Sequence, residues 1–267
     1  RAGYRLTMNV PFTKASACGN DFLIIQARYA PADLHAFTRA ICDRHNGVGA
    51  DGVEWLQPSQ DADIAIRLVN ADGSDAEISG NGTRCVAAHL VASGAKAPLR
   101  IMTGAGLKIC ELISQHGQRY EFETAMGKPE VGKPALLQID KKETSGTPVS
   151  MGNPHLVVFV TDFSATWQGE AAQIQHQDIF HEGVNVEFVR IAGPNRIDVR
   201  FFERGVGETQ SSGTGSCASA VAAIAAGHVK SPVNVHAPGG AQEVLWSGAE
   251  VLLRGPAQII CQGEFFA

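Results

Sequence analysis

Two short segments of the chain place a serine directly before a glycine-rich turn and an apolar run. They are Ser79-Gly80-Asn81-Gly82 and Ser212-Gly213-Thr214-Gly215. A serine in this place caps the helix that follows, and the helix start presents backbone N–H groups and a positive dipole end. Such a start suits a carboxylate ligand, and the glycines let the ligand approach the backbone closely. Each segment therefore predicts an anion-binding helix start with a hydroxyl beside it.

The two segments lie 133 positions apart, and the same offset relates other parts of the chain. It pairs Asn20 of GNDF with Asn153 of GNPH, and it pairs the run 64–69 with the run 197–202. The offset is close to half of the 267 residues. We interpret this pattern as one unit folded twice. A site between the copies would receive one matching element from each and could act on both faces of a substrate atom.

Amide, acidic and basic side chains accompany the serines at strand ends and in loops. They are Asn20, Asn70, Asn153, Asn185, Glu203, Arg204 and His155. Taken singly, each asparagine is most simply a turn former, and a serine before a helix is most simply a cap. Their matched or adjacent positions in the repeat favour a shared role. Amides together with a glutamate and an arginine provide the groups that bind the ammonium and carboxylate of an amino acid.

The elements that would position these residues are mostly strands. Short apolar runs predict strands at 22–25, 53–56, 64–69, 99–102, 107–112, 120–123, 156–160, 186–191, 197–202, 233–236, 243–246, 251–253 and 258–261. Helices are predicted over 31–43 and 165–175 and after each serine, ending near Gly94 and Gly227. Each copy is thus mostly sheet with one apolar helix that a curved sheet could wrap. The Pro/Gly/Thr-rich residues 126–150 are the expected boundary.

Composition excludes several classes of protein. The net charge is −5 and no Lys/Arg block occurs, which disfavours nucleic acid and anionic membranes as partners. No stretch approaches the ~20 apolar residues of a membrane span. The six cysteines form no CxxC motif and are interpreted as reduced thiols of a cytoplasmic protein.

Two further segments are set aside as functional signals. Residues 47–52 fit the pattern GxGxxG, but a predicted strand follows where a dinucleotide site needs a helix. The first residues lack the apolar region of a signal peptide, so Met8 is a candidate start and residues 1–7 a leader or added residues.

On these motifs the chain resembles the diaminopimelate epimerases, a PLP-independent family of amino-acid racemases. The resemblance runs from about Phe12 over nearly the whole chain. It rests on GNDF (19–22), NADGS (70–74), GNGTRC (80–85), GNPH (152–155), ERGVGET (203–209) and SGTG (212–215). It implies an α+β fold of two similar α/β-roll domains, each a sheet wrapped round a central helix, related by internal duplication. The expected domains are residues 8–127 with a returning strand at 257–267, and residues 128–256.

The resemblance also implies a reaction. Members convert LL-diaminopimelate to meso-diaminopimelate for lysine and peptidoglycan precursor synthesis, in the cytoplasm, without cofactor or metal and often as homodimers. One thiolate removes the α-proton, and a second thiol returns a proton to the opposite face. Carried over by motif, the substrate-binding positions are Asn20, Asn70, Gly80, Asn81, Asn153, Asn185, Glu203, Arg204, Gly213 and Thr214, and the catalytic positions are Ser79, Ser212, His155 and Glu203.

Ser79 and Ser212 stand where the resemblance places the two cysteines. Cys85 and Cys217 do not replace them, because they lie beyond the turns and inside the predicted helices. A thiol has a pKa near 8.5 that falls at a helix start, whereas a serine hydroxyl is a far weaker acid and needs a neighbouring base.

Three functions therefore stay open. The first is epimerisation with proton transfer through His155 and Glu203, directly or by way of the serines. The second is binding of diaminopimelate without turnover, by a natural homologue or a Cys-to-Ser trap. The third is isomerisation of another small acid by Glu and His bases on the same fold.

Overall fold

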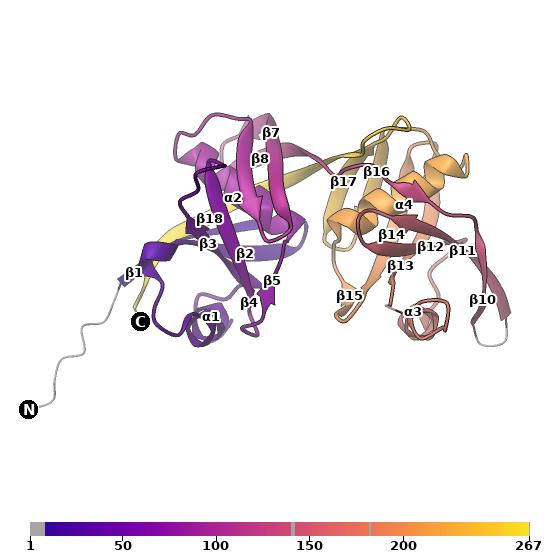
Figure 1. Cartoon of the computed structure of the whole chain (residues 1–267), viewed down its shortest axis with the longest axis horizontal. Helices are drawn as coiled ribbons and strands as arrows, with labels where there is room; N and C mark the ends of the chain where they lie inside the picture. The colour runs from indigo at the N-terminus through magenta and orange to yellow at the C-terminus, as the bar shows by residue number, and fades with distance from the viewer. Residues whose placement is uncertain (1–8, 140–141, 182, 267) are drawn as a thin grey trace, which may run out of the picture. The chain divides into compact units, whose positions relative to one another are not determined.

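The structure is a computed structural model that describes residues 9–139, 142–181 and 183–266. The chain divides into two units (Figure 1). The first runs to Phe122 and resumes at Pro256, and the second is Glu123–Gly255. The limits expected from the sequence were 127/128 and 256/257. Residues 1–7, expected as a leader, lie outside the described residues.

The first unit contains a curled sheet and two helices. Its elements are β1 (Asn9–Ala17), β2 (Asn20–Gln26), η1 (Ala27–Tyr29), α1 (Leu34–Cys42), β3 (Gly52–Gln57), β4 (Ile64–Asn70), β5 (Asp75–Ala76), α2 (Gly80–Ala92), β6 (Leu99–Thr103), β7 (Gly106–His116), β8 (Arg119–Ala125) and the end of β18 (Leu252–Phe266). Strand β2 pairs parallel with β3, β3 pairs antiparallel with β4, and β4 pairs parallel with β6.

Both faces of the β2–β3 sheet are covered, which explains why these strands read as continuous apolar runs. Phe22 and Ile24 belong to the buried cluster around α2, whereas Leu23 and Ile25 belong to the cluster around α1. Alternate side chains of a strand point to opposite faces, so one run of residues serves two cores. Figure 1 shows α2 among the strands of its unit.

The second unit repeats this plan. Its elements are β9 (Glu130–Val131), β10 (Ala135–Ile139), β11 (Lys142–Ser150), β12 (Pro154–Val160), α3 (Trp167–Gln175), β13 (Asn185–Gly193), β14 (Arg196–Glu203), β15 (Gly207–Thr209), α4 (Gly213–Ala225), β16 (Val233–Ala237), β17 (Gly240–Leu245) and the start of β18. Strands β12 and β13 pair parallel, β13 and β14 antiparallel, and β14 and β16 parallel.

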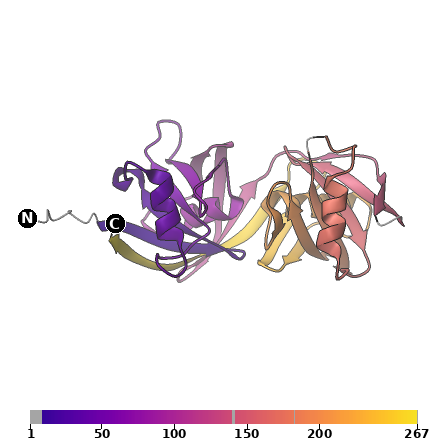
Figure 2. The ribbon, with the colours of Figure 1, turned by 90° about the horizontal axis from the view of Figure 1, so that it is seen from below.

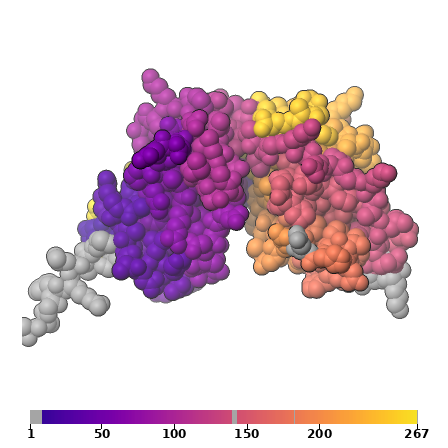
Figure 3. All heavy atoms as spheres, viewed as in Figure 1, coloured from indigo at the N-terminus to yellow at the C-terminus, as the bar shows by residue number. Residues whose placement is uncertain are grey.

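Small residues let the second sheet close around α4. Ala218, Ala220, Ala222 and Ala223 are at most 1 % exposed and share one cluster with β-branched residues of the surrounding strands. The outer helices α1 and α3, indigo and salmon in Figure 2, each cover a face of the sheet in their own unit. Figure 3 shows one face of each unit with all heavy atoms drawn as spheres. The predicted α+β fold of two similar rolls is confirmed. Among the described residues, no helix has the length and apolar character needed to cross a membrane.

The structure corrects the sequence-based elements in two places. The range 126–150, expected as a boundary rich in Pro, Gly and Thr, contains the strands β9, β10 and β11. Leu137 and Ile139 of β10 alternate with the exposed Gln138, the pattern of a half-buried strand, and the Pro and Gly residues around them obscured it. The strands expected at 251–253 and 258–261 are one strand, β18. Its register with β17 ends at Arg254 and its register with β1 begins at Gln258, so Pro256 falls between the two registers and its missing N–H interrupts neither.

Candidate active site

Each of the two predicted serines caps its helix. The Ser79 Oγ accepts a hydrogen bond of 3.0 Å from the N–H of Gly82 at the start of α2. The Ser212 Oγ accepts one of 3.2 Å from the N–H of Gly215 at the start of α4. Both residues have the extended backbone of an N-cap. Because the oxygen accepts in this bond, the hydroxyl proton can still be donated.

The first two backbone N–H groups of α2 and of α4 make no hydrogen bond within their own helix. They belong to Gly80 and Asn81 in α2 and to Gly213 and Thr214 in α4, positions that have no acceptor inside the helix. A Cβ added at Gly80 would meet no atom within 4 Å, so this helix start is open to an approaching group. The geometry within each unit therefore suits the carboxylate binding that the sequence predicts.

Asn20 and Asn81 are joined in the first unit. The Asn81 Nδ2 donates to Asn20 Oδ1 at 2.8 Å, and the Asn20 Nδ2 donates to Asp51 Oδ2 at 3.1 Å. The guanidinium of Arg84 also binds Asn81 Oδ1. Arg44 holds Asp51 with a hydrogen bond of 2.7 Å. The side chain at the second position of α2 is thus fixed by a network that begins at the GNDF motif.

Asn70 is engaged separately. It ends β4 and donates from Nδ2 to the Oγ of Ser74 at 3.0 Å, within the turn that the NADGS motif predicts. Its backbone N–H also donates to the carbonyl of Ser74 at 2.8 Å. Its neighbour across the sheet is Gly52, where an added Cβ would lie 2.8 Å from the carbonyl oxygen of Val69. Among the described residues, no hydrogen bond joins Asn70 to Asn20.

A connected network crosses the second unit. The Asn153 Nδ2 lies 3.5 Å from Thr214 Oγ1, and the His155 Nε2 lies 3.0 Å from Asn153 Oδ1. The other ring nitrogen, Nδ1, lies 2.7 Å from Glu187 Oε1. Because the amide oxygen can only accept, Nε2 carries a proton, and a second proton is shared between Nδ1 and Oε1.

Glu187, the carboxyl partner of His155, was not among the residues singled out from the sequence. His155 and Glu187 are only 2 % and 1 % exposed. Burial raises the pKa of Glu187, and the nearby carboxylate of Glu203 acts in the same direction, while His155 opposes both. A buried acid with a raised pKa beside a histidine is a candidate for acid–base chemistry.

Asn185 positions the chain before and after it. Its Nδ2 donates to the carbonyl of Pro154 at 2.9 Å, and its Oδ1 accepts from the backbone N–H of Arg204 at 3.0 Å. Glu203 accepts at Oε1 from Thr209 Oγ1 at 2.9 Å. The Arg204 side chain passes Gly183, where an added Cβ would lie 2.7 Å from its Cδ. The structure thus groups Asn153, His155, Asn185, Glu203 and Arg204 around β12, β13 and the end of β14.

The structure also buries a second glutamate that sequence reasoning missed. Glu54 lies in β3, is 0 % exposed, and occupies the position 133 residues before Glu187. Neither carboxyl oxygen has a hydrogen-bond partner among the described residues. Burial raises its pKa to about 8. The matching runs GVEWL and NVEFV each contain one acid inside an apolar strand, and this is the signal that could have identified both residues.

The cysteines of the two helices are packing residues, as the sequence indicates. Cys85 and Cys217 are 0 % exposed within the clusters around α2 and α4. Burial raises the pKa of the Cys85 thiol, which keeps it protonated.

Residues 47–52 form the connection from α1 to β3, so no helix follows the GxGxxG pattern. Within the described ranges, no group of three or more His, Cys, Asp or Glu residues could hold a metal ion.

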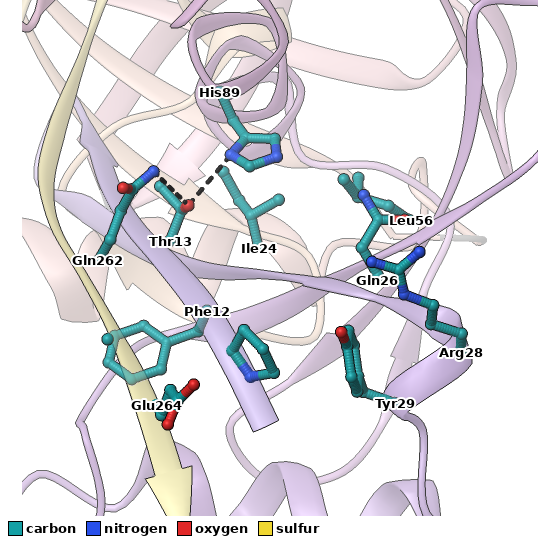
Figure 4. A pocket seen from close by; sticks show the side chains of 12 residues that line it. Phe12, Thr13, Ile24, Gln26, Arg28, Tyr29, Leu56, His89, Gln262 and Glu264 are labelled. Atoms are coloured by element: carbon teal, nitrogen blue, oxygen red, sulfur yellow. Dashed lines mark hydrogen bonds between the residues drawn. The ribbon is translucent and has the colours of Figure 1, made fainter. Parts of the chain in front are cut away.

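A surface hollow of about 490 Å³ lies in the first unit, away from the predicted residues. Figure 4 shows His89 of α2 and Gln262 of β18 directed at the Thr13 hydroxyl, at 3.1 and 3.3 Å. Its lining includes Ile24 and Leu56 but none of the predicted site residues. The candidate site therefore rests on the two helix starts and their networks.

Comparison with known proteins identifies a family to which the chain is similar. Residues 12–131 and 147–260 match the family model described as diaminopimelate epimerase. The diaminopimelate epimerase of Pelotomaculum thermopropionicum is 39 % identical over 95 % of this chain and 98 % of that protein. The one from Halothermothrix orenii is 36 % identical over 96 % and 98 % of the two chains.

Solved structures share the fold at low sequence identity. A PhzF-family phenazine biosynthesis protein of Bacillus anthracis aligns with a TM-score of 0.72 at 16 % identity, covering 97 % of this chain and 99 % of that one. A hydroxyproline epimerase from Agrobacterium vitis, with bound trans-4-hydroxy-L-proline, aligns with a TM-score of 0.69 at 18 % identity, covering 98 % and 92 %.

Proposed function

Because this chain belongs to the diaminopimelate epimerase family, we propose that it epimerises LL-diaminopimelate to meso-diaminopimelate by moving a proton at the α-carbon. The observation that carries the proposal is a serine-capped helix start in each unit, joined in both cases to the asparagine of a GN motif. An epimerisation with two proton-carrying groups needs two such places. Each unit supplies one candidate.

The substrate's reacting carboxylate is assigned to the helix starts. The N–H groups of Gly80 and Asn81, and of Gly213 and Thr214, have no acceptor in their helices and lie at positive dipole ends. A carboxylate bound there is stabilised, and so is the enolate-like charge that develops on it when the α-proton leaves. Proton removal then needs no external electron sink, which supports a reaction without cofactor or metal.

The distal amino-acid group of the substrate is assigned to a frame of amides and charges. Asn153, Asn185, Glu203 and Arg204 are grouped around β12–β14 in the second unit, with Asn20 and Asn70 in the first. Arg204 provides a charged donor for the carboxylate, and Glu203 an acceptor for the ammonium. The amides complete the pattern of donors and acceptors.

Proton transfer is assigned to Ser79 and Ser212, the positions where the resemblance places cysteines. A serine needs a base beside it. In the second unit the His155–Glu187 pair is the available proton carrier, with Glu203 close enough to influence the Glu187 pKa. His155 and Glu203 therefore remain in the proposed catalytic set.

The remaining parts of the proposal follow from the relatives' name. The product meso-diaminopimelate would serve lysine and peptidoglycan precursor synthesis in the cytoplasm, and the working form is proposed to be a homodimer. The partner of the site is thus a small amino acid, with no nucleic acid or membrane involved. The net charge of −5 agrees with the last point.

The test is uptake of deuterium at the α-carbon of LL-diaminopimelate in D2O, followed by NMR and mass spectrometry. The chain is compared with Ser79→Cys/Ser212→Cys and with Ser93→Cys, which adds a thiol at the exposed C-cap of α2. We expect uptake and conversion by the unchanged chain, and equal rates for Ser93→Cys. If neither the unchanged chain nor the double variant takes up deuterium, and calorimetry detects no heat of diaminopimelate binding, diaminopimelate is rejected as the substrate.

A second candidate function is binding without turnover. It is favoured by the serines themselves, because a hydroxyl ionises far less readily than a thiol and both oxygens already accept a capping bond. In that case calorimetry detects diaminopimelate binding, the unchanged chain takes up no deuterium, and Ser79→Cys/Ser212→Cys does.

A further inference from the structure

Glu54 faces the helix that carries the first candidate site. In β3, Val53 and Trp55 point into the cluster around α1, whereas Leu56 points into the cluster around α2. Because side chains alternate along a strand, Glu54 lies on the same face as Leu56 and is directed at α2. An acid in this position is surrounded by the core of the first unit rather than by solvent.

The Glu54 carboxyl group is buried without a hydrogen bond from any described residue. Arg84 of α2 is turned elsewhere, to Asn81 Oδ1 and to the carbonyl of Pro256 at 3.2 Å. A buried polar group without a partner costs on the order of 1–3 kcal/mol, and an ionised one more. Packing alone would be better served by an apolar residue, so a role in chemistry is the stronger explanation.

The group lies against the start of α2. A Cβ added at Gly82 would overlap Glu54 Oε1, and the same Cβ would lie 3.2 Å from Ser79 Cβ. The carboxyl oxygen and the serine side chain therefore border one small volume beside Gly82. Because Gly82 has no side chain, the Glu54 carboxyl group can occupy the space beside it. Ser79 itself is half-buried, so it can be reached from outside while Glu54 cannot.

The second unit contains the same arrangement with one difference. Glu187 faces α4, and a Cβ at Gly215 would lie 2.9 Å from its Oε1. Glu187 binds His155, whereas the residue 133 positions before His155 is Phe22. In each unit, a buried glutamate thus lies beside the glycine at the third position of the helix that the serine caps: Glu54 beside Gly82, and Glu187 beside Gly215.

We propose that Glu54 is the proton store of the first unit and acts through Ser79, a role that rests on the epimerisation proposed above. In one direction the carboxylic O–H of Glu54 gives its proton to Ser79 Oγ. The Ser79 hydroxyl proton passes at the same time to the substrate carbanion, and a new C–H bond forms. The original α-proton has gone to the second unit's base, and Glu54 is left as carboxylate. The reverse direction runs through the same groups, so no oxidant or reductant is needed.

The test uses Glu54→Gln in the full chain, with LL- and meso-diaminopimelate each incubated in D2O. Conversion and α-deuterium uptake are measured separately. The introduced amide cannot store the proton, while the second unit's base is intact. Conversion should fall by roughly 100-fold or more, whereas one of the two isomers should still exchange its α-proton. A merely structural change would lower conversion and exchange by the same factor.

The control is Thr38→Val, which removes another buried and unpartnered polar group of the first unit and should leave both rates unchanged. Should Glu54→Gln not fold, Glu54→Asp, which keeps a titrating group at shorter reach, is measured in the same way and should show the same separation of the two rates. Equal rates for the variant and the unchanged chain, or losses in proportion, would overturn the role of Glu54. Inactivity of the unchanged chain would reject the epimerase proposal itself, before any variant is compared.

Discussion

The two units build the same frame around a helix start and treat one buried acid differently. In both, the side chain at the second helical position binds an asparagine 61 residues earlier, Asn81 with Asn20 and Thr214 with Asn153. In the second unit Glu187 binds a histidine, whereas in the first unit Glu54 has no hydrogen-bond partner among the described residues. The backbone and the cap therefore repeat, while the placement of protons does not.

The physical cause of this difference is a single position on the strand next to each glutamate. His155 follows the start of β12, and Phe22 occupies the matching place in β2. The His155 imidazole is a hydrogen-bonding partner for Glu187, whereas a phenyl ring at the matching position has no donor to offer Glu54. One acid is thus kept in a hydrogen-bonded pair and the other as a neutral acid.

The largest effect is expected from His155→Phe, which makes the second unit like the first. It leaves Glu187 buried and unpaired, and the free energy of unfolding should fall by about 3–5 kcal/mol. Urea denaturation at pH 7 measures the change. His176→Phe, at an exposed histidine whose ring hydrogen-bonds to the carbonyl of Ala172, is the control and should change the midpoint little. A similar midpoint for His155→Phe would mean that the His–Glu pair contributes no net stability.

Replacing the buried glutamate by glutamine should change the free energy of unfolding at pH 7 in opposite directions in the two units. Because the pKa of Glu54 is raised to about 8 in the folded chain, folding takes up a proton between the ordinary Glu pKa and pH 8, and stability falls as pH rises through that window. Glutamine has no such dependence. The gain from Glu54→Gln should therefore grow by about 3 kcal/mol from pH 4.5 to pH 7.

Glu187→Gln should instead destabilise the chain at pH 7, since the hydrogen bond to His155 loses its charge. Thermal unfolding of both variants across pH 4.5–8 measures these differences. A Glu54→Gln curve parallel to that of the unchanged chain would show that Glu54 titrates normally.

A smaller effect is expected at the glycines that face the glutamates. Gly82→Ala places a methyl group where Glu54 Oε1 lies and should cost about 2 kcal/mol. Gly215→Ala meets Glu187 Oε1 and Phe201 at 2.9 Å and should cost less. Gly80→Ala, with open space at its Cβ, should leave the unfolding free energy unchanged or slightly higher. Similar values for Gly82→Ala and Gly80→Ala would contradict the close approach of Glu54 to α2.

The smallest effect tests the feature that the units share. Ser79→Ala and Ser212→Ala each remove one capping bond and should each lower stability by about 1 kcal/mol. Ser247→Ala, at an exposed loop serine, should stay within about 0.5 kcal/mol of the unchanged chain. Clearly unequal losses at the two caps would break the equivalence of the helix starts.

The sequence predicted those features that depend on neighbouring residues. The capping serines and the helices after them follow from local chemistry, and the apolar runs of β2, β3, β12 and β13 follow from burial on both faces. The two-roll fold followed from the motifs and is confirmed. Strand β1 was not predicted, because the run NVPFTKASA mixes polar and small residues and shows little apolar period.

The proton-carrying pair could not be predicted, because it depends on register between distant strands. His155 contacts Glu187 because β12 and β13 run parallel in a register that places His155 opposite Asn185. The isolation of Glu54 depends likewise on how α2 packs on β3, and on Arg84 turning to Asn81. Such contacts form only when the sheet has closed around its helix.

Because β18 pairs with β1, the first unit is completed only after the elements of the second unit up to β17 have been synthesised. Residues 252–254 of β18 pair with β17 and its residues 258–266 pair with β1, so a segment made after the elements of the second unit up to β17 completes the sheet that contains β1. The second unit has its elements up to β17 before that segment emerges. During translation, the first unit must therefore wait for residues 258–266, and its β1 edge stays uncovered until they are made.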